Sequence, residues 1–153
     1  MQFEFLADNP HRVPQVISWW LTIWADRMGS DVKAMEEQLL SSLSKDQYPV
    51  HILALKNGEP IGTATLKMHE LNEMFPDKQY WVGSVFVEAA HRGDKVATAL
   101  TQEIIALARD RGLPHLYLQT SNLSGGLYAK LGWQPLQRFT YRGEETLLMR
   151  KLL

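Results

Sequence analysis

The sequence has no cysteine among its 153 residues. This absence excludes disulfide bonds, thiolate metal sites and a cysteine nucleophile, and it suits a reducing compartment, so we expect a cytoplasmic protein. Long apolar runs are missing too, which argues against a membrane-spanning segment. The N-terminal stretch lacks a basic region followed by an apolar run, so we expect no signal peptide.

Neither sign of charge is in excess, because 16 basic residues stand against 17 acidic ones. Nucleic acids and anionic membrane surfaces both favour a basic excess in their partners, so we expect neither as a partner. The five histidines are scattered without the spacing of metal ligands, so we expect no metal site. Apolar residues make up 45% of the chain, an ordinary share for one domain of this length.

The apolar residues recur at helical spacing in four segments and follow strand-like patterns in seven others. The predicted helices run from Val13 up to Gly29 and over 32–43, 94–111 and 123–131. The predicted strands cover 2–6, 50–55, 60–68, 80–87, 116–120, 133–141 and 145–152. The order is one strand, two helices, three strands, a helix, a strand, a helix and two strands. It predicts a mixed sheet with helices packed on it.

The first predicted helix contains three tryptophans whose positions differ relative to its apolar stripe. Trp20 and Trp24 fall on the stripe and are predicted to be core residues. Trp19 and Ile23 fall off it and have the better claim to a pocket or an interface. This helix and the closing hairpin at 133–152 are the two surfaces through which a homodimer could form, and the sequence leaves that option open.

A junction between strand and helix, from Arg92 to Thr98, has the composition of an anion site. Backbone N–H groups at a helix start lack partners and lie at the positive end of the helix dipole, so they suit a phosphate group. Gly93 permits close approach of the backbone, and Arg92 and Lys95 add positive charge. On these residues alone, an ordinary turn with solvated charges explains the junction equally well. The glycine patterns of dinucleotide-binding folds and P-loops are absent.

Two segments together carry a resemblance to a known family. The first, at 92–97, reads Arg-Gly-Asp-Lys-Val-Ala, and the second is Asn122 followed by Leu-Tyr-Ala-Lys-Leu-Gly-Trp at 127–133. They resemble the acyl-CoA-binding motif and the second hallmark motif of the GNAT superfamily of N-acetyltransferases. The order of elements is similar to that fold over essentially the whole chain. The resemblance implies a single α/β (α+β) domain over 1–153, with a mixed, mostly antiparallel central sheet flanked by helices.

The resemblance also implies acetyl-CoA as co-substrate, without a metal ion. The residues that it assigns to the cofactor are Val85, Phe86, Val87, Arg92, Gly93, Asp94, Lys95, Val96, Ala97, Thr98 and Asn122. Main-chain groups of 85–87 are expected to orient the pantetheine arm, the junction to hold the pyrophosphate, and Asn122 to contact the arm. Without the family resemblance, Asn122 is equally well explained as a helix cap.

Lys95 departs from the family pattern, which has glycine at this position. Glycine lets the pyrophosphate lie against the main chain, whereas lysine adds both bulk and a positive charge. Asp94, just before it, has a side chain that can cap the helix and compete with the anion for its N–H groups. We therefore predict that Lys95 points along the cofactor and that Asp94 points away from it.

Acetyl transfer from a thioester to an amine requires a deprotonated amine, a donor for the oxyanion and an acid for the departing thiolate. Tyr128 occupies the family's tyrosine position and is the predicted acid, although its spacing alone is typical of a core tyrosine. Glu73 is the first choice of base. The other candidates are His69 and Glu70, near the expected acceptor entrance, and Glu88, which follows the cofactor strand. Proton removal through a water chain is equally open.

These features predict an N-acetyltransferase that moves an acetyl group from acetyl-CoA to a primary amine by direct attack in a ternary complex. The lack of cysteine agrees with direct attack, because it excludes a cysteine acyl-enzyme. The expected acceptor is a small-molecule or peptide amine. Two alternatives stay open, a non-catalytic module that binds or senses acyl-CoA and a transferase that uses a longer acyl-CoA.

Overall fold

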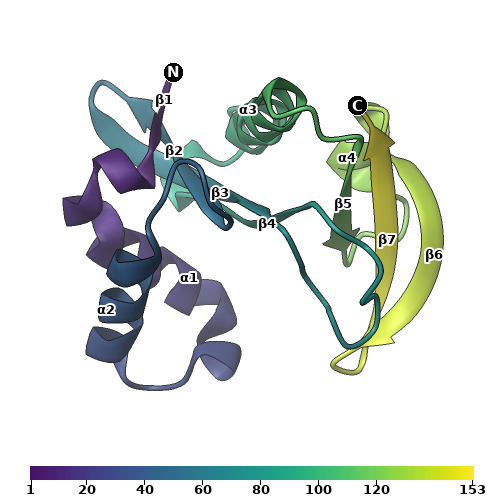
Figure 1. Ribbon diagram of the computed structural model, residues 1–153, viewed down its shortest axis with the longest axis horizontal. Coiled ribbons are helices and arrows are strands. Elements are labelled where there is room, and N and C mark those ends of the chain that lie inside the picture. The colour runs from purple at the N-terminus through teal and green to yellow at the C-terminus, as the bar shows by residue number, and fades with distance from the viewer.

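The computed structural model describes all 153 residues, and its centre is a seven-stranded sheet (Figure 1). The strands are β1 (Gln2–Phe5), β2 (Val50–Lys56), β3 (Glu59–Lys67), β4 (Trp81–Val87), β5 (His115–Thr120), β6 (Gln134–Tyr141) and β7 (Glu144–Leu152). Their spatial order is β1-β2-β3-β4-β5-β7-β6, and every neighbouring pair is antiparallel except β4 and β5. The predicted mixed, mostly antiparallel sheet is confirmed.

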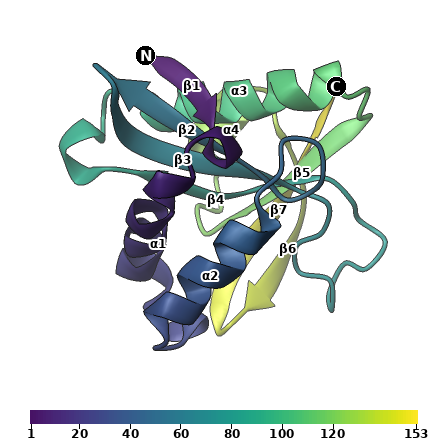
Figure 2. The ribbon, with the colours of Figure 1, turned by 60° about the vertical axis from the view of Figure 1, so that its left-hand side comes forward.

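Helices cover both faces of the sheet (Figures 1 and 2). They are α1 (Val13–Met28), α2 (Val32–Ser42), α3 (Val96–Asp110) and α4 (Gly126–Lys130), with 3-10 turns η1 (Leu6–Asp8), η2 (Pro10–Arg12) and η3 (Ala89–His91). The helix α3 packs on one face, whereas α1 and α2 pack together on the other. None of the helices is both long and apolar enough to cross a lipid bilayer.

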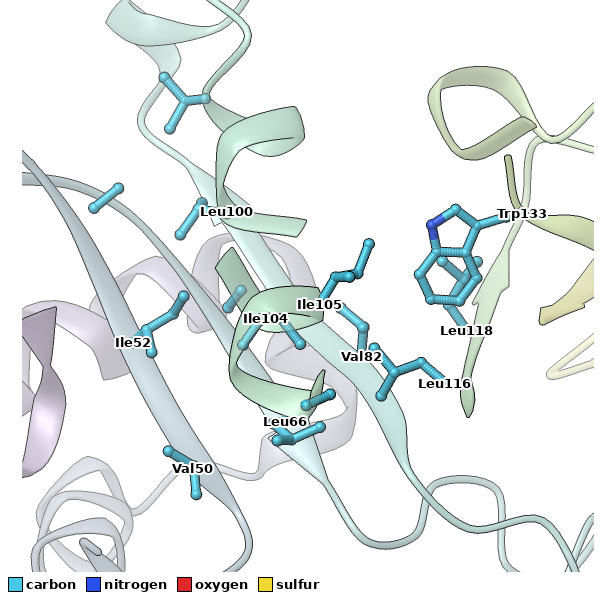
Figure 3. Packing of buried hydrophobic residues seen from close by; sticks show 14 of the residues in the cluster. Val50, Ile52, Leu66, Val82, Leu100, Ile104, Ile105, Leu116, Leu118 and Trp133 are labelled. Atoms are coloured by element: carbon cyan, nitrogen blue, oxygen red, sulfur yellow. The ribbon is translucent and has the colours of Figure 1, made fainter. Parts of the chain in front are cut away.

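The larger hydrophobic core lies between α3 and the sheet (Figure 3). Val96, Leu100 and Ile104 recur at helical spacing along α3, and all three are buried. They belong to one cluster with Ile52 of β2 and Leu66 of β3. Burying an aliphatic side chain of this size contributes about 1.5–3 kcal/mol. Because Val96 is the first residue of α3, this core also fixes the start of the helix relative to the sheet.

The helix predicted at 123–131 begins later, at Gly126, and is only five residues long. Gly125 precedes it with a φ of 84°, a left-handed conformation that cannot continue a right-handed helix. Asn122 therefore does not cap this helix. Its Oδ1 accepts hydrogen bonds from the N–H and the hydroxyl group of Ser124, so its side chain stabilises the turn before the helix.

The tryptophans of α1 differ from the prediction in two cases. Trp19 is buried and stacks on Phe86 at a centroid separation of 5.4 Å, so its assignment to a pocket or an interface is wrong. Trp24 is only half-buried and has non-helical φ and ψ angles, so a core position for it is also wrong. The helix is irregular at Trp24, and a uniform 3.6-residue stripe does not describe its second half. Trp20 packs partly buried against the core, and Ile23 is exposed.

The strands β4 and β5 are paired at one position, Trp81 with Tyr117, and then diverge (Figure 1). A bulge follows in β4, where Ser84 and Val85 together face only Ala64 of β3. Ser84 has a φ of 52°, a left-handed conformation that is uncommon outside glycine. A bulge disrupts the local ladder and re-aims the strand. Because Trp81 with Tyr117 is the one pair between β4 and β5, the main-chain groups of β4 after Val82 have no strand partner on the β5 side.

A histidine is buried on the α1 face of the sheet. His51 of β2 places Nδ1 2.7 Å from the hydroxyl oxygen of Thr65, and its ring lies beside Trp20. Burial, helped by the nearby positive charge of Lys67, lowers the pKa of His51 from 6.5 to about 4. His51 is therefore neutral in the folded protein under conditions in which it becomes protonated in the unfolded chain.

The difference between the pKa of His51 in the folded and unfolded states predicts that acid destabilises the protein over a defined pH range. Because the folded-state pKa is depressed, stability is full above pH 6.5 and falls as the pH drops toward 4, where the loss from this residue reaches about 3 kcal/mol. Urea unfolding of the wild type and His51→Gln at several pH values measures it. The wild type should lose more stability than the variant, which lacks the titrating group. Parallel pH dependences for the two proteins would show that His51 does not make this contribution.

Candidate active site

A cavity of about 670 Å³ lies where β4 and β5 part. Its walls include residues 82–85 of β4 and residues 118–121 at the end of β5. The second half of α1, the β6–β7 hairpin and α4 complete it. A volume of this size is typical of small-molecule sites, and its lining mixes apolar side chains with a few charged ones, as such sites do.

The bulge of β4 forms part of the cavity wall, because Ser84 and Val85 both line it. Main-chain N–H groups that lack a ladder partner are available to a ligand at this point. Such fixed donors can stabilise negative charge that develops on a reacting oxygen. Sequence reasoning missed this bulge, although Gly83 inside an otherwise apolar strand is a recognised signal for one.

A charged cluster lies on the cavity wall beside the bulge. Lys67 Nζ is 3.0 Å from Glu70 Oε1, and Gln119 Nε2 donates to Glu70 Oε2 at 3.3 Å. The cluster lies tightly against Gly83, where an added Cβ would approach Glu70 Oε1 to 2.7 Å. Lys67 and Gln119 were not predicted as site residues, because they come from β3 and β5 and their convergence is set by the tertiary fold.

The far end of the cavity lies between α1 and the β6–β7 hairpin. The Arg27 guanidinium lies 5.4 Å from the centroid of the Tyr141 ring, and both residues line the cavity. Ile23, Trp24 and Glu144 line it as well. The predicted pocket position of Ile23 is therefore confirmed. Acidic and basic side chains both reach this wall, so the cavity is polar without a single sign of charge.

Tyr128 of α4 also lines the cavity. Its ring packs against Trp133 at a centroid separation of 6.2 Å. Burial raises the pKa of the Tyr128 hydroxyl group above its usual value of 10.0, because the phenolate is poorly solvated there. The hydroxyl group therefore stays protonated at neutral pH and can act as a donor inside the cavity.

The junction between β4 and α3 is exposed from Arg92 to Lys95. Gly93 and Lys95 both have left-handed backbones, with φ of 90° and 62°. Lys95 is the residue before α3, and no side chain caps the helix, so Asp94 does not act as a cap. The uncapped N–H groups of the first turn are free to bind an anion. Arg92 Nε donates to the carbonyl oxygen of Val87, which holds its side chain against the end of β4.

The other predicted cofactor residues extend from the cavity to this junction. Val85 lines the cavity, and Phe86 is buried on the opposite face, so the Phe86 main chain is the part that can meet a ligand. Val96 is buried under α3, whereas Ala97 and Thr98 are half-buried in its first turn. None of the residues from Arg92 to Thr98 lines the cavity itself.

The four candidate bases lie in different surroundings. Glu70 lines the cavity, whereas Glu73 lies in an adjoining hollow of about 580 Å³ that shares Glu70 and Gln119 with it. His69 lines a third hollow, of about 360 Å³. The Glu88 carboxylate accepts a hydrogen bond from the indole N–H of Trp19, on the α1 side of the sheet.

Comparison with known proteins identifies a family and a fold. The model of the acetyltransferase (GNAT) family matches residues 13–133 of the chain. No match was found among curated protein sequences.

Solved structures share the fold at low sequence identity. The chain is similar to an aminoglycoside 6'-acetyltransferase type Ii, with a TM-score of 0.76 and 17% identity over 99% of this chain and 97% of that one. It is similar to a ribosomal-protein-alanine N-acetyltransferase from Brucella melitensis, with a TM-score of 0.76 and 18% identity over 100% of both chains. An aminoglycoside 6'-N-acetyltransferase complexed with coenzyme A is similar at a TM-score of 0.76 and 14% identity, over 99% and 97% of the two chains.

The left-handed backbone of Lys95 predicts a gain in stability for Lys95→Gly. Glycine adopts a positive φ without the steric cost that a side chain brings, so the variant should be more stable by about 0.5–1 kcal/mol. The control is Lys56→Gly, an exposed lysine at the end of β2 without a positive φ, where glycine should destabilise. Urea unfolding compares the two. Equal destabilisation by both substitutions would contradict the prediction.

Proposed function

Because the chain belongs to the acetyltransferase (GNAT) family, we propose that it moves an acetyl group from acetyl-CoA to a primary amine by direct attack in a ternary complex. The observation that carries this proposal is the cavity between the diverging strands β4 and β5. It brings main-chain donors of the β4 bulge, a protonated tyrosine and the half-buried carboxylate of Glu70 together. The chain has no cysteine, so the acetyl group cannot pass through a cysteine acyl-enzyme.

The cofactor is proposed to run from the α3 junction along β4 into the cavity. Arg92 and the uncapped N–H groups at the start of α3 would hold the pyrophosphate, since both favour an anion. Lys95 would add a further positive charge along the cofactor. Main-chain groups of 85–87 would then bind the pantetheine arm, which has amide groups that pair well with an open strand. The structural neighbour that was solved with coenzyme A is consistent with this class of cofactor.

The bulge at Ser84 is proposed to stabilise the tetrahedral intermediate. Attack of the amine on the thioester carbonyl moves negative charge onto its oxygen, and an N–H group held in place lowers the energy of that state. The bulge supplies such groups in the cavity wall. When the intermediate collapses, the C–S bond breaks and the thiolate leaves.

Tyr128 is proposed to donate a proton or a hydrogen bond to the departing thiolate. Its hydroxyl group is protonated at neutral pH, because its pKa lies above the usual value of 10.0, and it lies in the same cavity as the bulge. A positioned acid commonly contributes about 10²–10⁴-fold to a rate.

Glu70 is favoured over Glu73 as the group that accepts the proton of the amine. Glu70 lines the cavity, and both of its oxygens are held by partners, whereas Glu73 is exposed in the adjoining hollow. A held carboxylate can bind the ammonium form of the acceptor and take its proton directly or through a water molecule. Glu144 adds a second negative charge to the cavity lining. The proposed acceptor is therefore a small-molecule or peptide amine that enters from this side.

A panel of primary amines tests the proposed function directly. The purified protein is incubated with acetyl-CoA and each amine, including small amines, amino sugars and peptides, and free thiol is followed over time. We expect release of coenzyme A above the hydrolysis rate for at least one class. Tight binding of coenzyme A without turnover of any amine would contradict catalysis and favour a binding or sensing module.

Tyr128→Phe separates the acid from the packing role of this side chain. The phenyl ring can keep its contact with Trp133, so acetyl-CoA binding should change little, whereas kcat should fall about 100-fold with the loss of the acid. Steady-state kinetics and calorimetry with coenzyme A give the two readings. An unchanged kcat would assign Tyr128 to the packing of α4 alone.

Glu70→Gln and Glu73→Gln form a matched pair for the base. Both remove one negative charge near the cavity, but only Glu70 lines it, so Glu70→Gln should lower kcat/KM about 100-fold. Glu73→Gln should remain within about threefold of the wild type, as is usual for an exposed side chain. The measurement is kcat/KM of the wild type and of both variants at several pH values. A larger loss in Glu73→Gln would reverse the assignment.

A further inference from the structure

Trp19 and Glu88 connect α1 to the end of β4. The indole N–H of Trp19 donates a hydrogen bond to Glu88 Oε1 across 69 positions of the chain. Trp19 is only 5% exposed, and its ring stacks on Phe86 with an interplanar angle of 17°. A buried indole has one donor group and needs a partner for it. This contact therefore satisfies Trp19 and at the same time fixes the Glu88 carboxylate.

Glu88 lies at the entrance to the anion junction. Its backbone N–H donates to the carbonyl oxygen of Ile61 at 2.8 Å, and η3 follows directly and leads to Arg92. Arg92 lies over the same aromatic ring that Trp19 stacks on, because its guanidinium is 5.8 Å from the centroid of Phe86. Arg92 Nε donates a hydrogen bond to the carbonyl oxygen of Val87, the residue before Glu88.

Despite this proximity, Glu88 forms no ion pair with Arg92. The ion pairs of the molecule are Arg12–Glu59, Lys45–Asp8 and Lys67–Glu70. An unrestrained carboxylate near a guanidinium would form a charge-assisted hydrogen bond with it, as carboxylates and phosphates both do. Such a bond would occupy the donors that an incoming phosphate needs and would weaken the positive potential of the junction.

We propose that Trp19 is a positioning residue that holds the Glu88 carboxylate on its indole N–H and so leaves the Arg92 guanidinium free for the pyrophosphate of coenzyme A. This rests on the proposed function, because the anion is the pyrophosphate of the cofactor. Trp19 does not touch the cofactor and acts through Glu88. Without the hydrogen bond from Trp19, the Glu88 carboxylate can bind Arg92 and compete there with the pyrophosphate.

The substitution of either partner tests the proposal through coenzyme A binding, measured by titration calorimetry. Trp19→Phe keeps an aromatic ring against Phe86 but removes the N–H donor, so the Kd for coenzyme A should rise about tenfold, an effect of one charged hydrogen bond. Adding Glu88→Gln to Trp19→Phe should restore the Kd to near the wild-type value, because the released side chain is then neutral. Glu145→Gln, an exposed carboxylate of β7, is the control for a change of charge elsewhere.

A second pair keeps Trp19 in place in case the indole is needed for folding. Glu88→Asp and Glu88→Asn are both one methylene too short for the indole, and they differ only in charge. Glu88→Asp should bind coenzyme A about tenfold more weakly than Glu88→Asn, which corresponds to one charged hydrogen bond. Thermal unfolding of each variant reports whether it is folded.

The outcomes separate this inference from the proposed function. If the wild type binds coenzyme A but the double variant is as weak as Trp19→Phe, Trp19 contributes packing alone and the inference is wrong. Equal affinities of Glu88→Asp and Glu88→Asn would overturn it as well. If the wild type does not bind coenzyme A, the proposed function fails first and the inference fails with it.

Discussion

The parting of β4 from β5 is the constraint on which the rest of the site depends. The two strands are parallel and share one pair, Trp81 with Tyr117, whose rings also pack together at 5.4 Å. This pair belongs to an aromatic cluster that includes Phe75 and Phe139, so the closed end of the opening is firmly packed. Beyond it, the polar backbone groups of β4 require water or a ligand as partners. The fold therefore keeps an open strand edge inside the molecule, where a chain of amide groups can bind.

The strand β4 links the parts of the site in order along one segment. It begins at the packed pair, passes through the bulge at Ser84 and ends before the junction at Arg92. The core beneath α3 fixes the far side of the junction, since Val96 is buried there. The helix α1 meets the same strand twice, through Trp19 near Glu88 and through residues that line the cavity. The proposed cofactor and acceptor sides of the cavity would thus share one strand and one helix.

The sequence was sufficient for features that depend on local signals. Helical spacing, alternating strands and the Arg92–Gly93 junction identified nearly all elements and the proposed anion site. The tertiary arrangement decided the remainder. The contacts of Glu70 with Lys67 and Gln119 join residues of β3 and β5, which no spacing reveals. The irregular turn at Trp24 takes that residue out of the core, because a stripe assumes a uniform helix. Trp19 is buried by its contacts with Phe86 and Glu88, which are distant in sequence.

The most direct test of this account is a titration of ¹⁵N-labelled protein with coenzyme A, followed by backbone amide shifts. A cofactor that lies along β4 should cause its largest shifts at residues 84–87 and 92–98, with smaller ones at 118–121. The backbone amide shifts of β1 and β2 should change little. Saturable binding with its largest shifts outside these segments would contradict a cofactor path between β4 and β5.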